Sequence, residues 1–477
     1  MDQNQIPLFN KLMEHKMKKT ISFHVPGHKS GILLNGLDEA FTNFMEFDVT
    51  ELSGLDDLHE PDEAIFEAQQ LLSNVYRTKK SYFLVNGSTV GNLAMILACC
   101  KEGDAVLVQR NCHKSILNGL MMANVKPIFI TPEIQSDLSL TSKVNPTYVK
   151  QAFEQYPNIK ACIFTYPDYY GKTYNLKRII EIAHLHDSVV LIDEAHGPHF
   201  QLGGPFPPSA LTLGADIVVH SAHKMLPAMT MGSYLHVNSE RIVQEKVEFY
   251  LSALQSSSPS YPIMASLDIA RAYLANFSEE DVIYTLAKRK NFLNELVNKP
   301  KLYVHPLEEG QDPLKMLISH EDLTGYELQT VFENQHIYPE MADPFQVLFT
   351  LPLLKRHMEF PYEEAAKKIN MMHWEKTNSL RPINSSPINK DKKICTLFFS
   401  YKEMLDKTTE IIAMNKAVGR IAAKMVIPYP PGIPLLLPGE IITIEHIEQL
   451  RELIRTNTHF QGGGELLKVE KVEVFIY

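Results

Sequence analysis

The fold of this 477-residue chain is decided by two stretches, Val189–Gly197 (VVLIDEAHG) and Ala215–Lys224 (ADIVVHSAHK). Each is a short apolar run that ends in a cluster of polar side chains. Runs too apolar to face water on either side are typical of parallel strands whose sheet is covered by helices. In such open sheets a ligand binds beyond the carboxyl ends of the strands. We therefore expect Asp193 and Lys224 to converge at that edge of the sheet.

The surrounding sequence repeats a pattern of strand, loop and helix. Apolar runs predict further strands, and helical periodicity predicts helices between them. The strands are expected at 81–85, 104–108 and 161–165, and the helices at 90–100, 176–186, 263–276 and 279–298. This alternation indicates a doubly wound α/β fold with a mainly parallel sheet.

The pairing of a lysine with an aspartate fits one cofactor in particular, pyridoxal 5′-phosphate (PLP). PLP needs a lysine amine to form a Schiff base and a carboxylate to keep its ring nitrogen protonated. Lys224 and Asp193 can fill these roles, and Ser221 and His223 beside the lysine can reach a phosphate. The alternative is a solvated strand end without a ligand.

Two other segments leave a choice between a site and ordinary structure. Gly87, Ser88 and Thr89 form a predicted turn before a helix, which can either bind an anion or simply cap the helix. His113 follows the strand at 104–108, where a histidine is more often a cap or a core group than a ligand.

Several motifs together resemble the bacterial ornithine/lysine/arginine decarboxylases, which are PLP enzymes of the aspartate-aminotransferase fold. The resemblance rests on segments from near the start to near the end of the chain. They are FHVPGHK (23–29), GLDDLH (54–59), RNCHKS (110–115), DEAHG (193–197), SAHK (221–224) and YPPGIP (429–434).

The resemblance implies roles for individual residues. Lys224, His113 and Asp193 are expected to be catalytic, with His113 stacked on one face of the PLP ring and Ala195 packed on the other. The remaining cofactor-binding residues are expected to be Gly87, Ser88, Thr89, His196, Ser221 and His223.

The implied reaction is α-decarboxylation of arginine, lysine or ornithine to an amine and CO₂. Candidate proton donors to the substrate Cα are Lys224, His223 and His196. The cationic substrate tail needs a carboxylate partner, and the candidates are Glu51, Asp56, Asp57 and Glu440. Leu226 and Met231 depart from the pattern of relatives, so the preferred substrate stays open.

Composition excludes several other classes of protein. With 46 basic and 56 acidic residues the net charge is −10, which argues against nucleic-acid binding. No apolar run approaches the roughly 20 residues that span a membrane, and the start lacks a signal-peptide pattern, so we expect a cytoplasmic protein. The five cysteines show no metal-binding or disulfide spacing.

Other functions match single features of this sequence. The tetrapeptide DEAH is also a helicase signature, but 87–92 lacks the lysine of a phosphate loop. A metal site from His196, His199 and the N-terminal histidines is disfavoured because Pro198 disrupts the spacing, so no metal is expected. An aminotransferase, a lyase or a catalytically silent PLP-binding protein remain alternatives, because one fold serves many reactions.

The expected organisation is an N-terminal arm (1–50), a large PLP-binding domain (51–290), a small α/β domain (291–380) and a C-terminal domain (381–477). A linker is expected at 377–393 and a rigid loop at 428–438. The segment 256–261 and the arm around His24 suggest a homodimer with a shared active site. The core motifs begin too early for the N-terminal wing domain of the large relatives, so no decamer is expected.

Overall fold

The computed structural model describes residues 1–34, 36–135, 140–296, 299–372, 393–429, 434–455 and 458–476. The chain divides into two compact units. Unit 1 comprises 1–99, 189–204 and 208–277, and unit 2 comprises 100–188, 205–207 and 278–477. The predicted linker, except Lys393, and residues 430–433 of the predicted rigid loop lie outside the described residues.

An eight-stranded sheet has the order β1-β9-β8-β7-β6-β2-β3-β14. In unit 1, β7 and β8 are parallel, and β9 runs antiparallel to both β8 and β1. In unit 2, β2 is parallel to β6 and β3, and β14 is antiparallel to β3. Only β9 and β14 therefore run against their neighbours in the described pairings, and the expected α/β fold with a mainly parallel sheet is confirmed.

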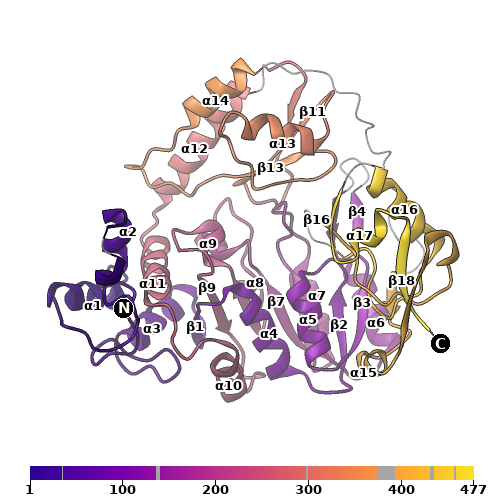
Figure 1. Cartoon of the computed structure of the whole chain (residues 1–477), viewed down its shortest axis with the longest axis horizontal. Helices are drawn as coiled ribbons and strands as arrows, with labels where there is room; N and C mark the ends of the chain where they lie inside the picture. The colour runs from indigo at the N-terminus through magenta and orange to yellow at the C-terminus, as the bar shows by residue number, and fades with distance from the viewer. Residues whose placement is uncertain are drawn as a thin grey trace. The chain divides into compact units, whose positions relative to one another are not determined.

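Unit 1 contains Val189–Gly197 and Ala215–Lys224, whose apolar runs form the adjacent strands β7 and β8; β7 is labelled in Figure 1. Its strands are β1 (Lys80–Leu84), β7 (Val189–Asp193), β8 (Ile217–His220) and β9 (Ser233–Val237). Its helices are α1 (Pro7–Met17), α2 (Glu39–Phe44), α3 (Ala64–Tyr76), α4 (Gly87–Cys99), α8 (Ala210–Leu213), α9 (Ala222–Met225), α10 (Gln244–Leu254) and α11 (Tyr261–Ala275), with 3₁₀ turns at Ile32–Leu34 and Pro198–Leu202.

Helix α4 packs very closely on this sheet. A Cβ at Gly91 would lie 2.8 Å from Leu84 Cδ1 and 2.9 Å from Val219 Cγ1, so only glycine fits there. The helix begins at Gly87, three residues before the predicted start, so the prediction of a turn over Gly87, Ser88 and Thr89 is wrong. Glycine and hydroxyl residues favour turns and caps in sequence, but they are also common in a first helical turn.

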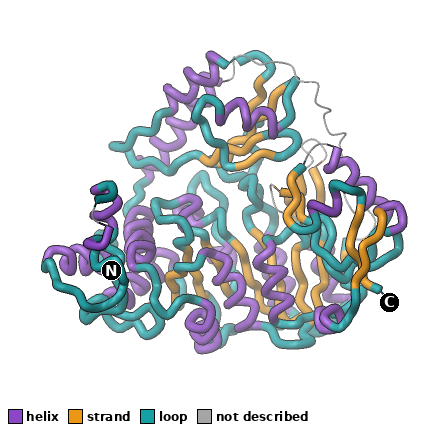
Figure 2. The backbone as a smooth tube through the Cα atoms, viewed as in Figure 1, coloured by secondary structure: helices purple, strands orange, loops and turns teal. Residues whose placement is uncertain are grey.

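Unit 2 contains the other strands of the large sheet and two smaller parts. The large-sheet strands are β2 (Ala105–Gln109), β3 (Lys126–Ile130), β6 (Ile159–Thr165) and β14 (Ile394–Thr396), accompanied by α5 (Lys114–Met122), α6 (Pro146–Gln155), α7 (Leu176–Leu185) and the hairpin β4 (Glu133–Gln135) and β5 (Leu140–Lys143). Figure 2 distinguishes the helices from the strands of the described residues.

The first smaller part of unit 2 is a four-stranded antiparallel sheet with helices, in the order β10-β11-β13-β12. Its elements are α12 (Glu279–Leu296), β10 (Leu302–Val304), β11 (Lys315–His320), α13 (Gly325–Glu333), β12 (Met341–Ala342), β13 (Val347–Thr350) and α14 (Tyr362–Met371). A capping box of Thr324 and Glu327 begins α13.

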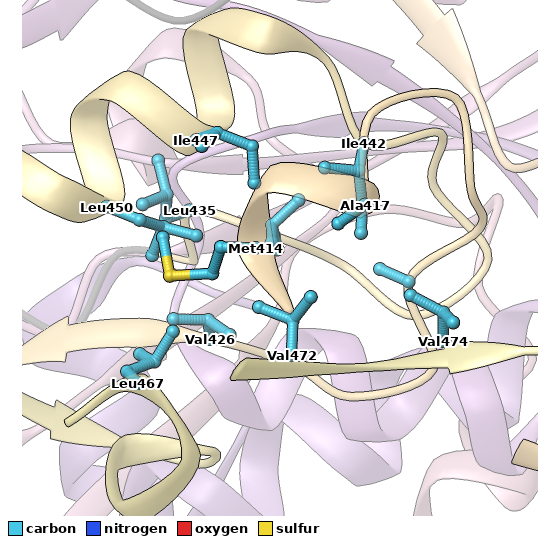
Figure 3. Close-up of a cluster of buried hydrophobic side chains, with 12 residues drawn as sticks. Met414, Ala417, Val426, Leu435, Ile442, Ile447, Leu450, Leu467, Val472 and Val474 are labelled. Carbon is cyan, nitrogen blue, oxygen red and sulfur yellow. The ribbon is translucent and has the colours of Figure 1, made fainter. Parts of the chain in front are cut away.

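The C-terminal part is built around Met414, which is fully buried. Figure 3 shows its thioether side chain among Leu435, Leu450 and Val472. All four residues belong to one apolar cluster. The elements are α15 (Tyr401–Leu405), β15 (Thr409–Ala413), a 3₁₀ turn (Met414–Lys416), β16 (Ile427–Tyr429), α16 (Ile444–Arg455), β17 (His459–Gln461), α17 (Gly464–Leu467) and β18 (Lys471–Phe475).

In the described residues, no helix combines the length and the apolar character that crossing a membrane requires.

Candidate active site

Asp193 ends strand β7 as a buried carboxylate held by two donors. Its Oδ2 accepts a hydrogen bond from Asn92 Nδ2 at 2.9 Å, and its Oδ1 accepts one from the Ala195 amide at 3.2 Å. The residue is 3% exposed and forms no ion pair with any described residue. A buried carboxylate without a cation is costly, so the position is suited to a cationic N–H group of a ligand.

Helix α4 supplies Asn92 and, at its start, Gly87, Ser88 and Thr89. Gly87 adopts a left-handed φ of 77° and its amide donates to Met231 O at 2.9 Å. Ser88 is half-buried and Thr89 is exposed at the helix start. The first turn of a helix has backbone N–H groups without intrahelical partners and a positive dipole end, which suits an anion.

Lys224 lies in the short helix α9, which follows β8. Its Nζ lies 2.9 Å from Nε2 of His196, in the loop that follows β7. The loops are also joined by the Ser221 amide, which donates to Ala195 O at 3.3 Å. Unit 1 thus brings the ends of β7 and β8 together as the sequence predicts. His223 is half-buried, and its amide donates to Gly232 O at 3.2 Å.

His113 belongs to unit 2 and caps the start of α5. Its Nδ1 lies 2.8 Å from Ser115 Oγ and accepts from the Ser115 amide at 3.3 Å. The half-buried ring is therefore fixed at one nitrogen. This is the cap that the sequence suggested as the ordinary role of a histidine after a strand.

Two of the four candidate carboxylates for the substrate tail already bind other groups of the protein. Glu440 forms a buried bidentate pair with Arg110, at 2.8 and 2.7 Å. The carboxylate of Asp56 accepts backbone N–H bonds around the start of α3, from residues 57, 62, 63, 65 and 66. Both carboxylates already have donors that satisfy them, so the expectation that Glu440 or Asp56 binds the substrate cation is not supported.

Glu51 and Asp57 are the two remaining carboxylates. Glu51 Oε2 accepts from the Thr50 hydroxyl, whereas its Oε1 is buried and has no hydrogen-bond partner among the described residues. Asp57 is half-buried, and its Oδ1 accepts from the His59 amide at 2.7 Å. Burial, together with Glu51, Asp56 and Asp57, raises the pKa of the neighbouring Tyr261, which indicates a locally negative environment.

Asn92 was missed by reasoning from sequence, although a signal for it exists. It is a fully buried amide in an otherwise apolar helical stretch. Buried polar side chains are hydrogen-bonded as a rule, so a lone amide on the buried face of α4 implies a polar partner on the sheet.

The residues of unit 1 fit PLP by their chemistry. The carboxylate of Asp193 suits a protonated pyridine nitrogen, the amine of Lys224 suits an aldehyde, and the start of α4 suits a phosphate. Within the described ranges, no group of three or more His, Cys, Asp or Glu side chains has the arrangement of a metal site.

Comparison with known proteins gives matches along nearly the whole chain. The family profile "Orn/Lys/Arg decarboxylase, major domain" matches residues 6–309, and the corresponding C-terminal domain profile matches 391–465. "Uncharacterized protein YaaO" of Bacillus subtilis (strain 168) is 44% identical, over 99% of this chain and 98% of its own. The arginine decarboxylase of Halalkalibacterium halodurans is 32% identical, over 96% of both chains.

Among solved structures, the constitutive lysine decarboxylase of E. coli aligns with a TM-score of 0.79 at 19% identity, covering 100% of this chain and 82% of that one. At this identity the alignment supports the fold. The two profiles and the full-length sequence similarity go further, and on their evidence the chain belongs to the Orn/Lys/Arg decarboxylase family, in the short form of about 480 residues.

Proposed function

We propose that this protein is a PLP-dependent decarboxylase that converts arginine, lysine or ornithine to the corresponding amine and CO₂. The family uses PLP and acts on basic amino acids. The observation that carries the proposal is the buried Asp193 carboxylate, held by Asn92 without a cation, in the same unit as the Lys224–His196 pair. The bound cofactor supplies an electron sink for the electrons released when CO₂ departs.

The protein's own residues have distinct roles in this proposal. Lys224 holds the cofactor covalently, and Asp193 keeps the ring nitrogen protonated through an ion pair that burial strengthens. Gly87, Ser88 and Thr89 bind the phosphate with Ser221 and His223, while His113 and Ala195 fix the plane of the ring. The bond from Cα to the substrate carboxylate must stand perpendicular to that plane for decarboxylation.

Proton delivery to the substrate Cα is assigned to the Lys224–His196 pair. Nζ of Lys224 and Nε2 of His196 are in hydrogen-bond contact, so a proton can pass from one to the other. His223 remains a further candidate donor.

The substrate tail is assigned to Glu51 or Asp57. A buried ammonium or guanidinium group needs a charged acceptor, and the unpartnered Oε1 of Glu51 is such an acceptor. We expect Glu51→Gln or Asp57→Asn to raise KM for the basic substrate about 10- to 100-fold, measured by steady-state kinetics. Glu60→Gln in the same acidic loop, which is exposed, is the matched control. Unchanged KM in both variants would remove these residues from the substrate site.

The minimum assembly is proposed to be a homodimer with a shared active site. Large apolar side chains are exposed along one N-terminal segment, and they include Ile21, Phe23, Val25, Ile32, Leu33, Leu37 and Phe41. Contiguous exposed apolar surface usually marks an interaction site. A second copy of the chain is the commonest partner of such a surface. The cytoplasmic location and the bounds of the four expected domains remain predictions.

The reaction is tested by incubating the purified protein and PLP with each of the three amino acids, and detecting the amine by chromatography. Lys224→Ala is the control and should form none. Amine from a neutral or acidic amino acid alone would contradict the basic-substrate assignment, and keto-acid formation would indicate transamination. Bound PLP without either product would indicate a catalytically silent protein.

The cofactor assignment is tested separately by borohydride reduction and peptide mapping. The phosphopyridoxyl label is expected on Lys224, and a label on another lysine would contradict the assignment. Asp193→Asn should still bind PLP but lose most turnover, because a neutral amide does not stabilise the protonated ring nitrogen.

A further inference from the structure

A chain of buried polar side chains runs behind the candidate active site within unit 1. It starts at Glu194, which follows Asp193 in the sequence. Glu194 is fully buried. The Glu194 carboxylate accepts hydrogen bonds from Ser209 Oγ at 2.7 Å and from the Ala210 amide at 2.8 Å, and it lies 2.7 Å from His220 Nε2. His220 in turn directly precedes Ser221.

The chain continues across the sheet from β8 to β1. His220 Nδ1 lies 3.1 Å from His236 Nε2, and His236 Nδ1 lies 2.8 Å from Ser81 Oγ. Ser81 Oγ lies 2.7 Å from the hydroxyl of Thr78. Ser81, His220 and His236 are fully buried, so the hydrogen bonds within the chain are protected from competition with water.

One direction of hydrogen bonding satisfies every member. Burial, reinforced by the neighbouring His220, lowers the pKa of His236 well below its ordinary value, so this ring is neutral and has one N–H. If His220 donates to the Glu194 carboxylate, it accepts from His236, which accepts from the Ser81 hydroxyl. The donors then all point toward Glu194, which is the anionic end.

Two further contacts tie this chain to the loop that carries His196. The ring of Tyr76 packs on His220 and His236, with centroid distances of 5.0 and 4.5 Å, and its hydroxyl donates to Pro198 O at 2.8 Å. A Cβ at Gly197 would lie 2.7 Å from Glu194 Cγ. The glycine of the DEAHG motif therefore makes room for the Glu194 side chain.

We propose that Glu194, His220 and His236 are positioning residues that fix the ends of β7 and β8, and thereby the Asp193 carboxylate and the Ser221–Lys224 segment. The inference rests on the proposed function, because it concerns the same cofactor site. Asp193 and Glu194 are adjacent residues with opposite tasks, since one faces α4 and the other holds the neighbouring strand. Because the two residues are consecutive, a movement of the backbone at Glu194 also moves the backbone that carries the Asp193 side chain.

The test measures PLP binding and the geometry of the bound cofactor rather than turnover. In Glu194→Gln an NH₂ group with two N–H donors replaces one carboxylate oxygen, and it faces either the Ala210 amide or the Ser209 hydroxyl and His220, which donated to the carboxylate. We expect the dissociation constant for PLP to rise about tenfold or more, and the visible circular-dichroism band of the bound cofactor to change. The same changes are expected in His220→Gln. The double variant should lose no more than the worse single variant, because each single variant already disrupts the contact between Glu194 and His220.

Asp268→Asn is the matched control. Asp268 is an equally buried carboxylate of unit 1, and its pair with Arg271 holds residues 3–8 instead of the strand ends. Its thermal unfolding midpoint without PLP should fall, as in Glu194→Gln, while its dichroism band and PLP affinity stay unchanged. Equal effects on PLP binding in both variants, or none in Glu194→Gln, would overturn the proposal.

Ser81→Ala provides a test if Glu194→Gln fails to fold. It removes one hydroxyl at the far end of the chain of buried polar side chains. It should change the dichroism band of bound PLP in the same direction as His220→Gln. An unchanged band in a folded Ser81→Ala would then overturn the proposal. If the wild-type protein binds no PLP, the proposed function fails instead, which separates the two outcomes.

Discussion

At the scale of single residues, the loop after β6 contains a buried carboxyl group, Asp168, whose pKa is raised. Asp168 is buried, and its Oδ1 accepts from the amides of Tyr170 and Lys172 at 2.9 and 2.8 Å. Its Oδ2 is buried without a hydrogen-bond partner among the described residues. Burial raises the pKa of Asp168 to about 7, against the opposing effect of its amide donors and of Lys172.

This raised pKa predicts a pH dependence of stability. The folded state keeps the Asp168 proton up to about pH 7, whereas the unfolded chain loses it near the ordinary value of 3.8. The folded state holds the extra proton between these values, so the free energy of unfolding falls as pH rises through this window, by at most about 1.4 kcal/mol per pH unit.

Asp168→Asn should remove this contribution, and its unfolding free energy should depend less on pH between 5 and 7. Urea unfolding at several pH values measures the slope. Asp406→Asn, at an exposed site in the same unit, should keep the slope of the parent. Identical slopes in Asp168→Asn and the parent would show that Asp168 is ionised throughout this range.

At the scale of elements, helix α4 connects the sheet to the candidate site. It supplies Asn92 to the end of β7, and Gly91 allows its close approach to β1 and β8. The sequence was sufficient to predict that β7 and β8 are buried strands, because their apolar runs have no polar face. It was insufficient for the contact of Glu194 with His220, because such contacts depend on strand register and on which face each side chain takes.

Gly91→Ala should displace α4 from the sheet. The added methyl group would overlap Leu84 and Val219, and overpacking of this kind costs about 1–3 kcal/mol. We expect a lower unfolding midpoint and, because Asn92 moves with the helix, weaker PLP binding. Gly464→Ala is the control, since its Cβ would meet only an ordinary contact at 3.4 Å. Equal stability in the two variants would contradict the packing argument.

At the scale of the whole molecule, the family and the fold were accessible from the order of motifs along the chain. The partner of Glu440 was not, because Arg110 precedes it by 330 residues and no local pattern links them. No sequence pattern distinguishes the roles of Asp56 and Asp57. The carboxylate of Asp56 accepts hydrogen bonds from several backbone amides, including that of Ile65, whereas that of Asp57 accepts one from the His59 amide.

The N-terminal arm predicts the oligomeric state. Phe23 is 95% exposed and Leu33 is 71% exposed in the single chain, so replacing both with serine should shift sedimentation from dimer toward monomer and lower activity. Leu405→Ser, at a residue 84% exposed in the C-terminal part, should leave the dimer intact. A fully active monomeric wild-type protein would contradict the shared active site.

In the proposed binding mode, helix α4 sets the distance between the phosphate-binding residues and Asn92. Ser88 at the phosphate end and Asn92 behind the ring-nitrogen carboxylate are four residues apart, which is about 6 Å along the axis and on nearly the same face. Inserting one residue between them would turn Asn92 by about 100° and lengthen the span by about 1.5 Å. We therefore expect this segment to tolerate hardly any change of length, besides having no room for a larger residue at Gly91.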